Sequence, residues 1–339
     1  MNARCRLPAI PGRQHGFVLV LTLWVLVIVA FAAAYFSERV ANSVELAQQS
    51  QQNTRAMLDM DGTRAEILYR LGTTSLTEYG LGRGNDIAVA LDNRPYQGLG
   101  DTIIQLQDNR GLLNLNIVED DRLHRLLGLL NVPADRRGRL IDTLRDYTDA
   151  DTLHRLNGAE KEDYLALDLP APPNNILSTP WEVRRIIGWR DTPELWHSGR
   201  LLELVTTSAS LGINPNTAPA EVLATLPGLT EEAARLIIAQ RQLAPFTSAV
   251  QLAQVAGVSA QPFEDSIGVI PSNCIRITQS LPGRTSALQY NIRLTPSGNE
   301  GPWRTDYYTR VSLAPGAVVR AAPTPLPPRS LAAHEAVPF

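Results

Sequence analysis

The longest apolar stretch of the chain lies near its start. Residues 17–36 are twenty residues without a charged side chain. At 1.5 Å per residue, a helix of this length is about 30 Å long, the thickness of the hydrocarbon core of a bilayer. Arg4, Arg6 and Arg13 precede the stretch, so the positive-inside bias predicts a cytoplasmic N-terminus and an external globular part. From hydropathy alone, the plainer interpretation is an uncleaved signal anchor.

After this stretch the pattern first stays helical and then changes to strands. Apolar residues recur near helical spacing to residue 70, which predicts one N-terminal helix over 17–71. Residues 72–116 predict loops and short strands. The sequence "DTIIQLQDNRGLLNLN" (101–116) predicts two strands, with "DNRG" supplying the turn between them.

The middle of the chain is helical, and its last part is again strand-like. Residues 117–272 contain short amphipathic segments separated by proline and glycine, which predicts an all-α domain. Residues 273–313 alternate apolar and polar positions, as in "CIRITQS" and "ALQYNIRL". The order predicts an α+β fold with a large helical domain inserted between its strands. The tail, 314–339, is rich in proline and alanine and predicts disorder.

Within the helical part, residues 213–255 have the pattern of a helix-hairpin-helix (SAM-like) region. Asn216 or Thr217 is suited to cap the first helix, and "LPGL" forms the hairpin. In versions that bind DNA, a second glycine in the hairpin lets backbone N–H groups reach a phosphate. Here Thr230 stands in that position.

The charges after this threonine oppose DNA binding. Glu231 and Glu232 suit the N-terminus of a helix but repel a phosphate. Arg235 and Arg241 remain available for phosphate contacts. Because these two arginines are available, the motif leaves one alternative function open, that of a membrane-anchored extracellular DNA-binding receptor.

Composition narrows the class of protein further. The 339 residues carry a net charge of −3, and the arginines at the start contribute positive charge only there. An acidic chain is a poor default partner for nucleic acid, and none is expected here. The five histidines are scattered, and the sequence has no H-E-x-x-H, G-x-S-x-G, P-loop or dinucleotide motif, so we predict no enzyme.

Carboxylates crowd one short segment of the helical part. They are Asp146, Asp149, Asp151, Glu160, Glu162 and Asp163. Calcium takes six to eight oxygen ligands, which such a segment could supply, although the spacing is not that of an EF-hand. Composition alone favours a solvated acidic loop.

Several motifs together resemble one family. The basic leader, the pair Gly16-Phe17 and the apolar stretch resemble the processing site of type IV prepilins and pseudopilins. The segments "DNRGLLNLN", "DYTDADTLHRLNGAEKEDY" and "INPNTAPAEVLATLPGL" follow in the order found in the K component of bacterial type II secretion systems, a large minor pseudopilin. The resemblance implies a leader over 1–16 that a prepilin peptidase removes, methylation of the new N-terminus, and a transmembrane segment over 17–36.

The resemblance also implies a domain plan, a role and partners. Residues 72–116 and 273–313 would form a pilin-like domain that carries the helical domain 117–272. The protein would be anchored once in the inner membrane, with its C-terminal domain in the periplasm. There it would cap the tip of the pseudopilus with the I and J components, followed by H and the major pseudopilin, and help to start assembly for the export of folded proteins across the outer membrane.

Two sets of residues take roles from the same resemblance. K components bind calcium in the helical domain, which assigns Asp149, Asp151, Glu160 and Asp163 as the expected Ca²⁺ ligands. Most pilin-like proteins carry glutamate at the fifth residue after the cleavage site, where this chain has Leu21. A carboxylate in a bilayer is costly without a partner, and the K component characteristically lacks it. Leu21 therefore marks a subunit at the tip.

Overall fold

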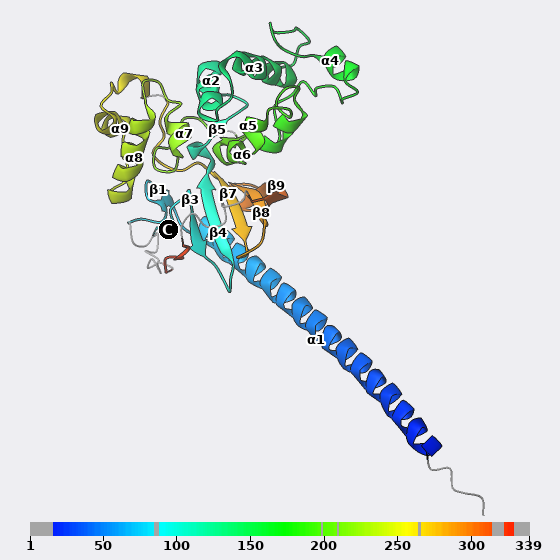
Figure 1. Ribbon diagram of the computed structural model, residues 1–339. Helices are drawn as coiled ribbons and strands as arrows, with labels where there is room; N and C mark the ends of the chain where they lie inside the picture. Colours follow the sequence, from blue (N-terminus) through cyan, green and yellow to red (C-terminus); the bar gives the residue numbers. More distant parts are fainter. Residues whose placement is uncertain are drawn as a thin grey trace, which may run out of the picture. The chain divides into compact units, whose positions relative to one another are not determined.

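The computed structural model describes residues 16–84, 88–197, 199–208, 210–263, 266–313 and 322–328. The chain forms two compact units, Met1–Met57 and Leu58–Phe339. The first unit holds most of the N-terminal helix. The second holds a β-sheet and the helices inserted between its strands (Figure 1).

The helix α1 (Gly16–Thr73) is continuous over 58 residues. Residues 17–61 contain neither glycine nor proline, so nothing in this part of the backbone interrupts the helix. Its apolar window has a mean hydropathy of 2.9 and is not buried in the protein. By length and composition, α1 can therefore cross a membrane once.

A six-stranded sheet lies at the centre of the second unit, in the order β10-β3-β4-β7-β8-β9. Neighbouring strands are antiparallel, except that β10 runs parallel to β3. The strands are β3 (Asp92–Gln97), β4 (Ile103–Asp108), β7 (Cys274–Ser280), β8 (Ser286–Leu294), β9 (Trp303–Ser312) and β10 (Thr324–Pro325). Ile67 and Leu71 of α1 pack against Ile104, Ile275 and Tyr290 of the sheet in one buried cluster.

The central strand β7 is buried on both faces. Ile275 and Ile277 belong to the cluster that also includes the end of α1. On the other face, Arg276 donates hydrogen bonds to the carbonyl oxygens of Leu202 and Glu203 in the helical domain. Alternating apolar and polar residues are typical of a strand with one face in contact with water. In β7 the inserted domain covers the polar face, and its backbone oxygens accept hydrogen bonds from Arg276.

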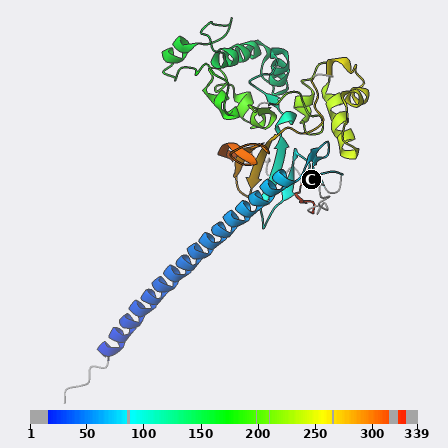
Figure 2. The same cartoon turned by 180° about the vertical axis from the view of Figure 1, so that it is seen from behind.

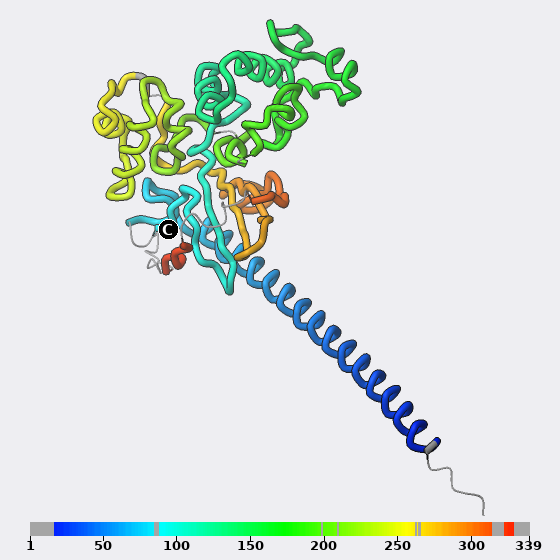
Figure 3. Tube along the Cα trace, viewed as in Figure 1, coloured from blue at the N-terminus to red at the C-terminus, as the bar shows by residue number. Residues whose placement is uncertain are grey.

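The helices lie between β4 and β7 in the chain. They are α2 (Asp120–Leu129), α3 (Ala134–Thr148), α4 (Lys161–Ala166), α5 (Pro193–Trp196), α6 (Arg200–Leu204), α7 (Ala220–Leu223), α8 (Glu231–Leu243) and α9 (Ala249–Ala256), with 3-10 helices η1 (Asn109–Gly111), η2 (Pro180–Arg185) and η3 (Gln261–Phe263). Figure 1 shows α2 to α9 gathered at the end of the sheet where β4 ends and β7 begins. The tube in Figure 3 runs from β4 into these helices and back into β7, so the helical domain is an insertion between two neighbouring strands.

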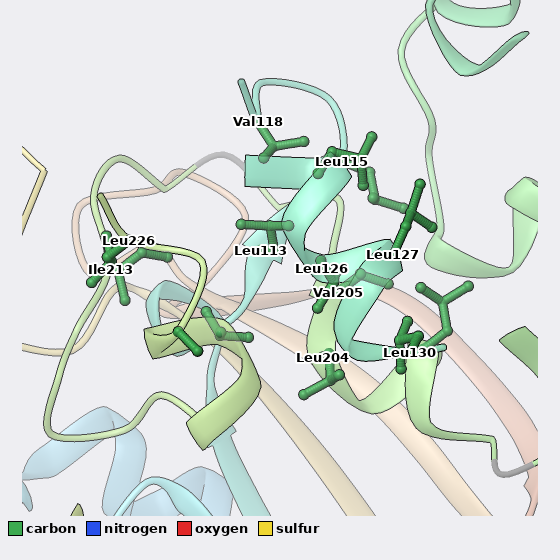
Figure 4. Close-up of a cluster of buried hydrophobic side chains, with 14 of the residues drawn as sticks. Leu113, Leu115, Val118, Leu126, Leu127, Leu130, Leu204, Val205, Ile213 and Leu226 are labelled. Atoms are coloured by element: carbon green, nitrogen blue, oxygen red, sulfur yellow. The ribbon is translucent and has the colours of Figure 1, made fainter. Parts of the chain in front are cut away.

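The inserted domain has a hydrophobic core of its own. On α2, Leu123, Leu126 and Leu127 are buried because positions three and four apart share one face of a helix. They meet residues from distant segments, including Leu204 and Val205 (Figure 4). This core is distinct from the cluster between α1 and the sheet.

The structure corrects two predictions about strands. The strands expected over 101–116 exist, but they do not form a hairpin: β4 pairs with β7, while β5 (Leu113–Asn114) pairs in parallel with β6 (Val205–Thr206). The pairing is wrong because η1 turns the chain out of the sheet and into the helical domain. Two more short strands, β1 (Leu76–Thr77) and β2 (Gly80–Leu81), pair with each other.

The tail is the second correction. Disorder was predicted for 314–339, but residues 322–328 are ordered against the sheet. β10 pairs with Tyr96 and Gln97 of β3, and Arg70 of α1 donates a 2.8 Å hydrogen bond to the carbonyl oxygen of Pro327. Only one large apolar side chain of this segment, Leu326, packs against the sheet cluster, so its composition did not reveal the order. Residues 314–321 and 329–339 lie outside the described residues.

Candidate functional site

The predicted processing site lies at the start of α1. Gly16 is the first residue of the helix, and Phe17 and Leu21 follow with 71% and 53% of their surface exposed. Exposed apolar side chains along the first turns suit a lipid environment. The leader, 1–16, falls outside the described residues except for Gly16, so cleavage and methylation remain predictions.

A buried carboxylate, Asp108, joins the sheet to the inserted domain. It ends β4, and its Oδ1 accepts hydrogen bonds from the backbone N–H of Arg110 (3.0 Å) and from both the N–H and the hydroxyl of Ser272 (2.8 Å each). Its Oδ2 accepts from Asn214 Nδ2 (3.0 Å) and Thr217 Oγ1 (2.9 Å). Burial raises the pKa of Asp108, and the donors act in the opposite direction. We call these five residues the Asp108 hub.

Other buried polar groups reinforce the same junction. Asn109 Nδ2 donates 2.7 Å hydrogen bonds to Ser208 Oγ and to Asn291 Oδ1 on β8. Arg276 is bonded to the carbonyl oxygens at the end of α6, as described above. We interpreted the motif "DNRG" as a turn and missed that it joins the sheet to the inserted domain. The sequence contained one indication of this role, because three polar residues stand together at the end of an apolar strand.

The residues expected to cap the first helix of the hairpin have other partners. Thr217 donates to Asp108, and Asn216 forms two hydrogen bonds with the backbone of Phe246, of 2.8 and 3.0 Å. The helix α7 begins after Pro219 without a side-chain cap. This correction has a physical reason: a buried donor or acceptor at a junction is costly to leave unsatisfied, whereas water can satisfy a helix end.

The second helix of the hairpin is built for structure more than for phosphate binding. Thr230 caps α8 by accepting from the N–H of Ala233. Arg235 lies on the surface, 2.8 Å from Glu232. Arg241 is buried and donates to the carbonyl oxygens of Pro215 and Ala218. The two arginines that remained for phosphate contacts are thus engaged within the protein, and the DNA-binding alternative is not favoured.

The acidic loop between α3 and α4 contains carboxylates without donors. Asp149 is half-buried at the end of α3, and its Oδ1 has no hydrogen-bond partner. Glu160 is 2% exposed at the start of α4, where it forms a capping box with Asp163. The first N–H groups of α4 lie beside its carboxylate, but neither oxygen accepts a hydrogen bond of good geometry. Asp151 is exposed, and its Oδ1 accepts a 2.8 Å hydrogen bond from the N–H of Leu153.

The pKa shifts show that these carboxylates interact. Burial raises the pKa of Asp149, and the charges of Asp151 and Asp146 raise it further. Burial likewise raises the pKa of Glu160, and Asp146 and Asp149 add to the shift. Asp146, whose pKa burial also raises, accepts hydrogen bonds from the N–H of Arg155. Arg155 and His154 lower these pKa values in part, but the net shift of each carboxyl is upward, so the loop concentrates negative charge that the protein compensates only partly.

Three of the four expected calcium ligands fall in this cluster. The fourth, Asp163, lies in the first turn of α4, where its Oδ2 accepts from the N–H of Glu160 (2.9 Å) and lies 3.5 Å from His154 Nε2. Orphaned buried carboxylate oxygens fit a hard divalent cation. Among the described residues, no three acidic, histidine or cysteine side chains are arranged around one metal position, so calcium binding stays a prediction.

The fold defines a class: an α+β protein with a long apolar N-terminal helix that can cross a membrane and an all-α domain inserted into its sheet. A family model described as "Type II secretion system (T2SS), protein K" matches residues 105–198, and a helix-hairpin-helix model matches 208–270. Residues 105–198 are thus similar to the type II secretion protein K family. A comparison with curated proteins found no match.

A solved structure shares the fold. It is a chain of the GspK–GspI–GspJ complex from the type 2 secretion system of enterotoxigenic Escherichia coli, with 17% identity and a TM-score of 0.56. The match covers 78% of this chain and 99% of that chain. The resemblance to a minor pseudopilin K and the predicted α+β fold with an inserted helix-hairpin-helix region are therefore confirmed. The matched family is a structural component of a secretion apparatus and not a known enzyme.

Proposed function

We propose that this protein is a minor pseudopilin that caps the tip of the periplasmic pseudopilus of a type II secretion system and helps to initiate its assembly. Through this role it would support the export of folded proteins across the outer membrane. The family match and the shared fold support the pseudopilin class. The N-terminal helix would anchor the protein once in the inner membrane, with its N-terminus cytoplasmic and the rest in the periplasm.

The observation that carries the tip position is the helical insertion at one end of the sheet. Residues 117–272 hold all eight α-helices that follow α1 among the described residues. The Asp108 hub and Arg276 fix this domain to the strands, so it cannot swing aside without breaking buried hydrogen bonds. Inside a helical filament, another subunit would need that space, whereas a subunit at the tip has none beyond it.

Leu21 supports the same position. In the proposed assembly, a carboxylate at this point would pair with the N-terminal ammonium of a neighbouring subunit. The first subunit of the filament has no earlier neighbour whose ammonium it could bind. An apolar residue at position 21 is therefore sufficient in this subunit. We expect Leu21→Glu to leave membrane insertion unchanged but to alter placement at the tip, measured by fractionation and by the stoichiometry of the isolated complex. Leu26→Glu is the matched control, and an equal effect of the two variants would contradict a special role for Leu21.

We further propose that calcium binds the acidic loop through Asp149, Asp151, Glu160 and Asp163. Calcium would supply positive charge that offsets the repulsion between these carboxylates and would tie the loop to α3 and α4. The carboxylates of Asp149 and Glu160, whose pKa values are raised by their acidic neighbours, would supply oxygens to the ion. The role is structural, because the loop contains no group arranged for a reaction.

The proposed partners are the I and J components, followed by H and the major pseudopilin, and a prepilin peptidase. The test is to express the full chain with the I and J components of the same bacterium and to purify the complex from membranes. We expect a ternary complex in which this chain begins at a methylated Phe17. A chain that still begins at Met1, or that purifies without either component, would show that the proposal is wrong.

A further inference from the structure

The two edges of the six-stranded sheet, which lie on opposite sides of it, differ in how they are protected against pairing with another strand (Figure 2). At one edge, β3 contains Pro95, its register shifts between Asp92 and Pro95, and β10 covers Tyr96 and Gln97. Proline, irregular register and a covering segment all prevent the addition of another strand. At the other edge, β9 has no proline and, among the described residues, no covering segment, although its register with β8 also shifts, between Thr305 and Tyr307. It is ten residues long, contains no proline or glycine, and among the described strands pairs with β8 alone.

The free charges along β9 are positive. Its one acidic residue, Asp306, already receives hydrogen bonds from Arg293 (2.8 Å) and Asn291 (3.0 Å). Arg304 has 61% of its side chain exposed and lies 3.4 Å from the same carboxylate. Arg310 is exposed and forms no salt bridge with any described residue. The open edge therefore presents more positive charge than the protein compensates.

A third arginine lies beside this edge. The guanidinium carbon of Arg64, on α1, is 5.2 Å from the ring centre of Tyr290 on β8 and 5.8 Å from that of Tyr308 on β9. Stacking on two aromatic rings holds a guanidinium in place. Its Nε is buried without a hydrogen-bond partner. A positioned guanidinium with an unused donor fits an incoming carboxylate.

We propose that the open edge of β9, together with Arg64, docks an extended acidic segment of another pilin-like subunit, which adds to the sheet as a strand. Backbone hydrogen bonds along β9 would provide the affinity, and Arg64, Arg304 and Arg310 would select a segment that carries carboxylates. This inference rests on the proposed function, which supplies the class of partner. It adds which surface of this chain meets that partner and by what chemistry.

Photocrosslinking within the full complex tests the docking surface. Thr305, exposed on β9, is replaced by p-benzoylphenylalanine in the full chain, expressed with the I and J components; a control chain carries it at Leu156, which is 96% exposed in the inserted domain. We expect Thr305 to crosslink to I or J, and Leu156 to neither. If the complex forms but position 305 crosslinks to neither component, or to a second copy of this chain, the docking surface is wrong while the proposed function stands. If no wild-type complex forms, both are contradicted.

Charge reversal tests the chemistry. The double variant Arg304→Glu/Arg310→Glu should bind the partner about tenfold more weakly, because each exposed pair contributes up to about 1 kcal/mol. Arg190→Glu, at an arginine of the inserted domain with 57% of its side chain exposed, should bind as the wild type does. Unfolding temperatures near that of the wild type show that the variants fold. Wild-type affinity of the double variant would overturn the selection of an acidic segment.

Discussion

The Asp108 hub and the acidic loop both place carboxylates away from water, but they surround them with opposite partners. Asp108 receives five hydrogen bonds, one from the nearby N–H of Arg110 and four from donors of two distant segments. Glu160 is also shielded from water, but only the first N–H groups of α4 lie beside its carboxylate, and neither oxygen accepts a hydrogen bond of good geometry. The protein itself satisfies the hydrogen-bonding capacity of Asp108, whereas it does not satisfy that of Glu160.

This difference separates two uses of the same chemical group. A carboxylate with enough donors stabilises one arrangement of the chain and needs nothing else. A carboxylate that instead faces other carboxylates is destabilising unless it binds a proton or a cation. Asp108 therefore acts as a permanent joint between two domains, whereas Asp149 and Glu160 make the stability of their loop depend on the solution.

The largest effect should come from removing the charge at the joint. In Asp108→Asn, one acceptor oxygen becomes an amide donor that faces existing donors. We expect a loss of about 2–4 kcal/mol in the free energy of unfolding, measured by denaturant titration. Asp135→Asn, at an exposed position in the first turn of α3, is the control and should change stability by less than about 0.5 kcal/mol. Equal losses of unfolding free energy in the two variants would mean that the Asp108 hub does not hold the inserted domain to the sheet.

The addition of calcium should stabilise the protein through the acidic loop and not through the Asp108 hub. At a calcium concentration about one hundred times the dissociation constant, binding to the folded state stabilises by about 2.7 kcal/mol, which calorimetry detects as a higher unfolding temperature. Glu160→Gln should lose this rise, while Asp108→Asn should keep it. In chelator, Glu160→Gln should be at least as stable as the wild type, because a repelled charge is gone. An unchanged unfolding temperature of the wild type on chelation would exclude a structural calcium site.

The response to pH should follow from the raised pKa values of Asp149 and Glu160. A carboxyl whose pKa is higher in the folded than in the unfolded state stabilises fully below the unfolded pKa, and this stabilisation is lost as pH rises through the folded pKa. In chelator, the loop should therefore lose stability from about pH 4 upward. Because protons and calcium compete, the gap in unfolding temperature between calcium and chelator should widen from pH 5 to 7.5. A gap independent of pH would contradict the assignment.

The smallest effect is expected at Asp163. Because its Oδ2 accepts from the N–H of Glu160 at the start of α4, Asp163→Ala should cost about 0.5–1 kcal/mol, as the loss of a capping interaction does. Its calcium response decides its second role. If the variant also loses the calcium-dependent rise in unfolding temperature, Asp163 is a ligand as well as a cap. If the rise is unchanged, the ligand set is confined to the other carboxylates.

Periodicity predicted the parts of the fold that depend on one segment at a time. The long α1, the return to strands after residue 273 and the amphipathic α2 all follow from the spacing of apolar residues. The crowding of Asp149, Asp151 and Glu160 was also visible, because these residues are neighbours in sequence. The match of the fold to a known pseudopilin followed from the order of several motifs.

The contacts between distant segments could not be predicted. Asp108 meets Asn214 and Ser272 across 106 and 164 residues, and no local pattern marks such a meeting. For the same reason β4 was assigned to a hairpin instead of to β7, and the ordered tail was missed. The loss of donors around Glu160 is also a property of the folded chain, because solvation of a carboxylate depends on what packs around it.

The insertion of a whole domain between β4 and β7 also constrains how the protein reaches its folded state. These strands are neighbours in the sheet, yet β7 begins more than 160 residues after β4 ends. Closing so long a loop by chance is entropically unfavourable, and contacts of high sequence separation form slowly. A helical domain that folds first brings its two ends together and so shortens the effective loop. The core of the insertion thus acts as a template for the completion of the sheet, which makes the stability of the inserted helices a determinant of the folding rate of the pilin-like domain.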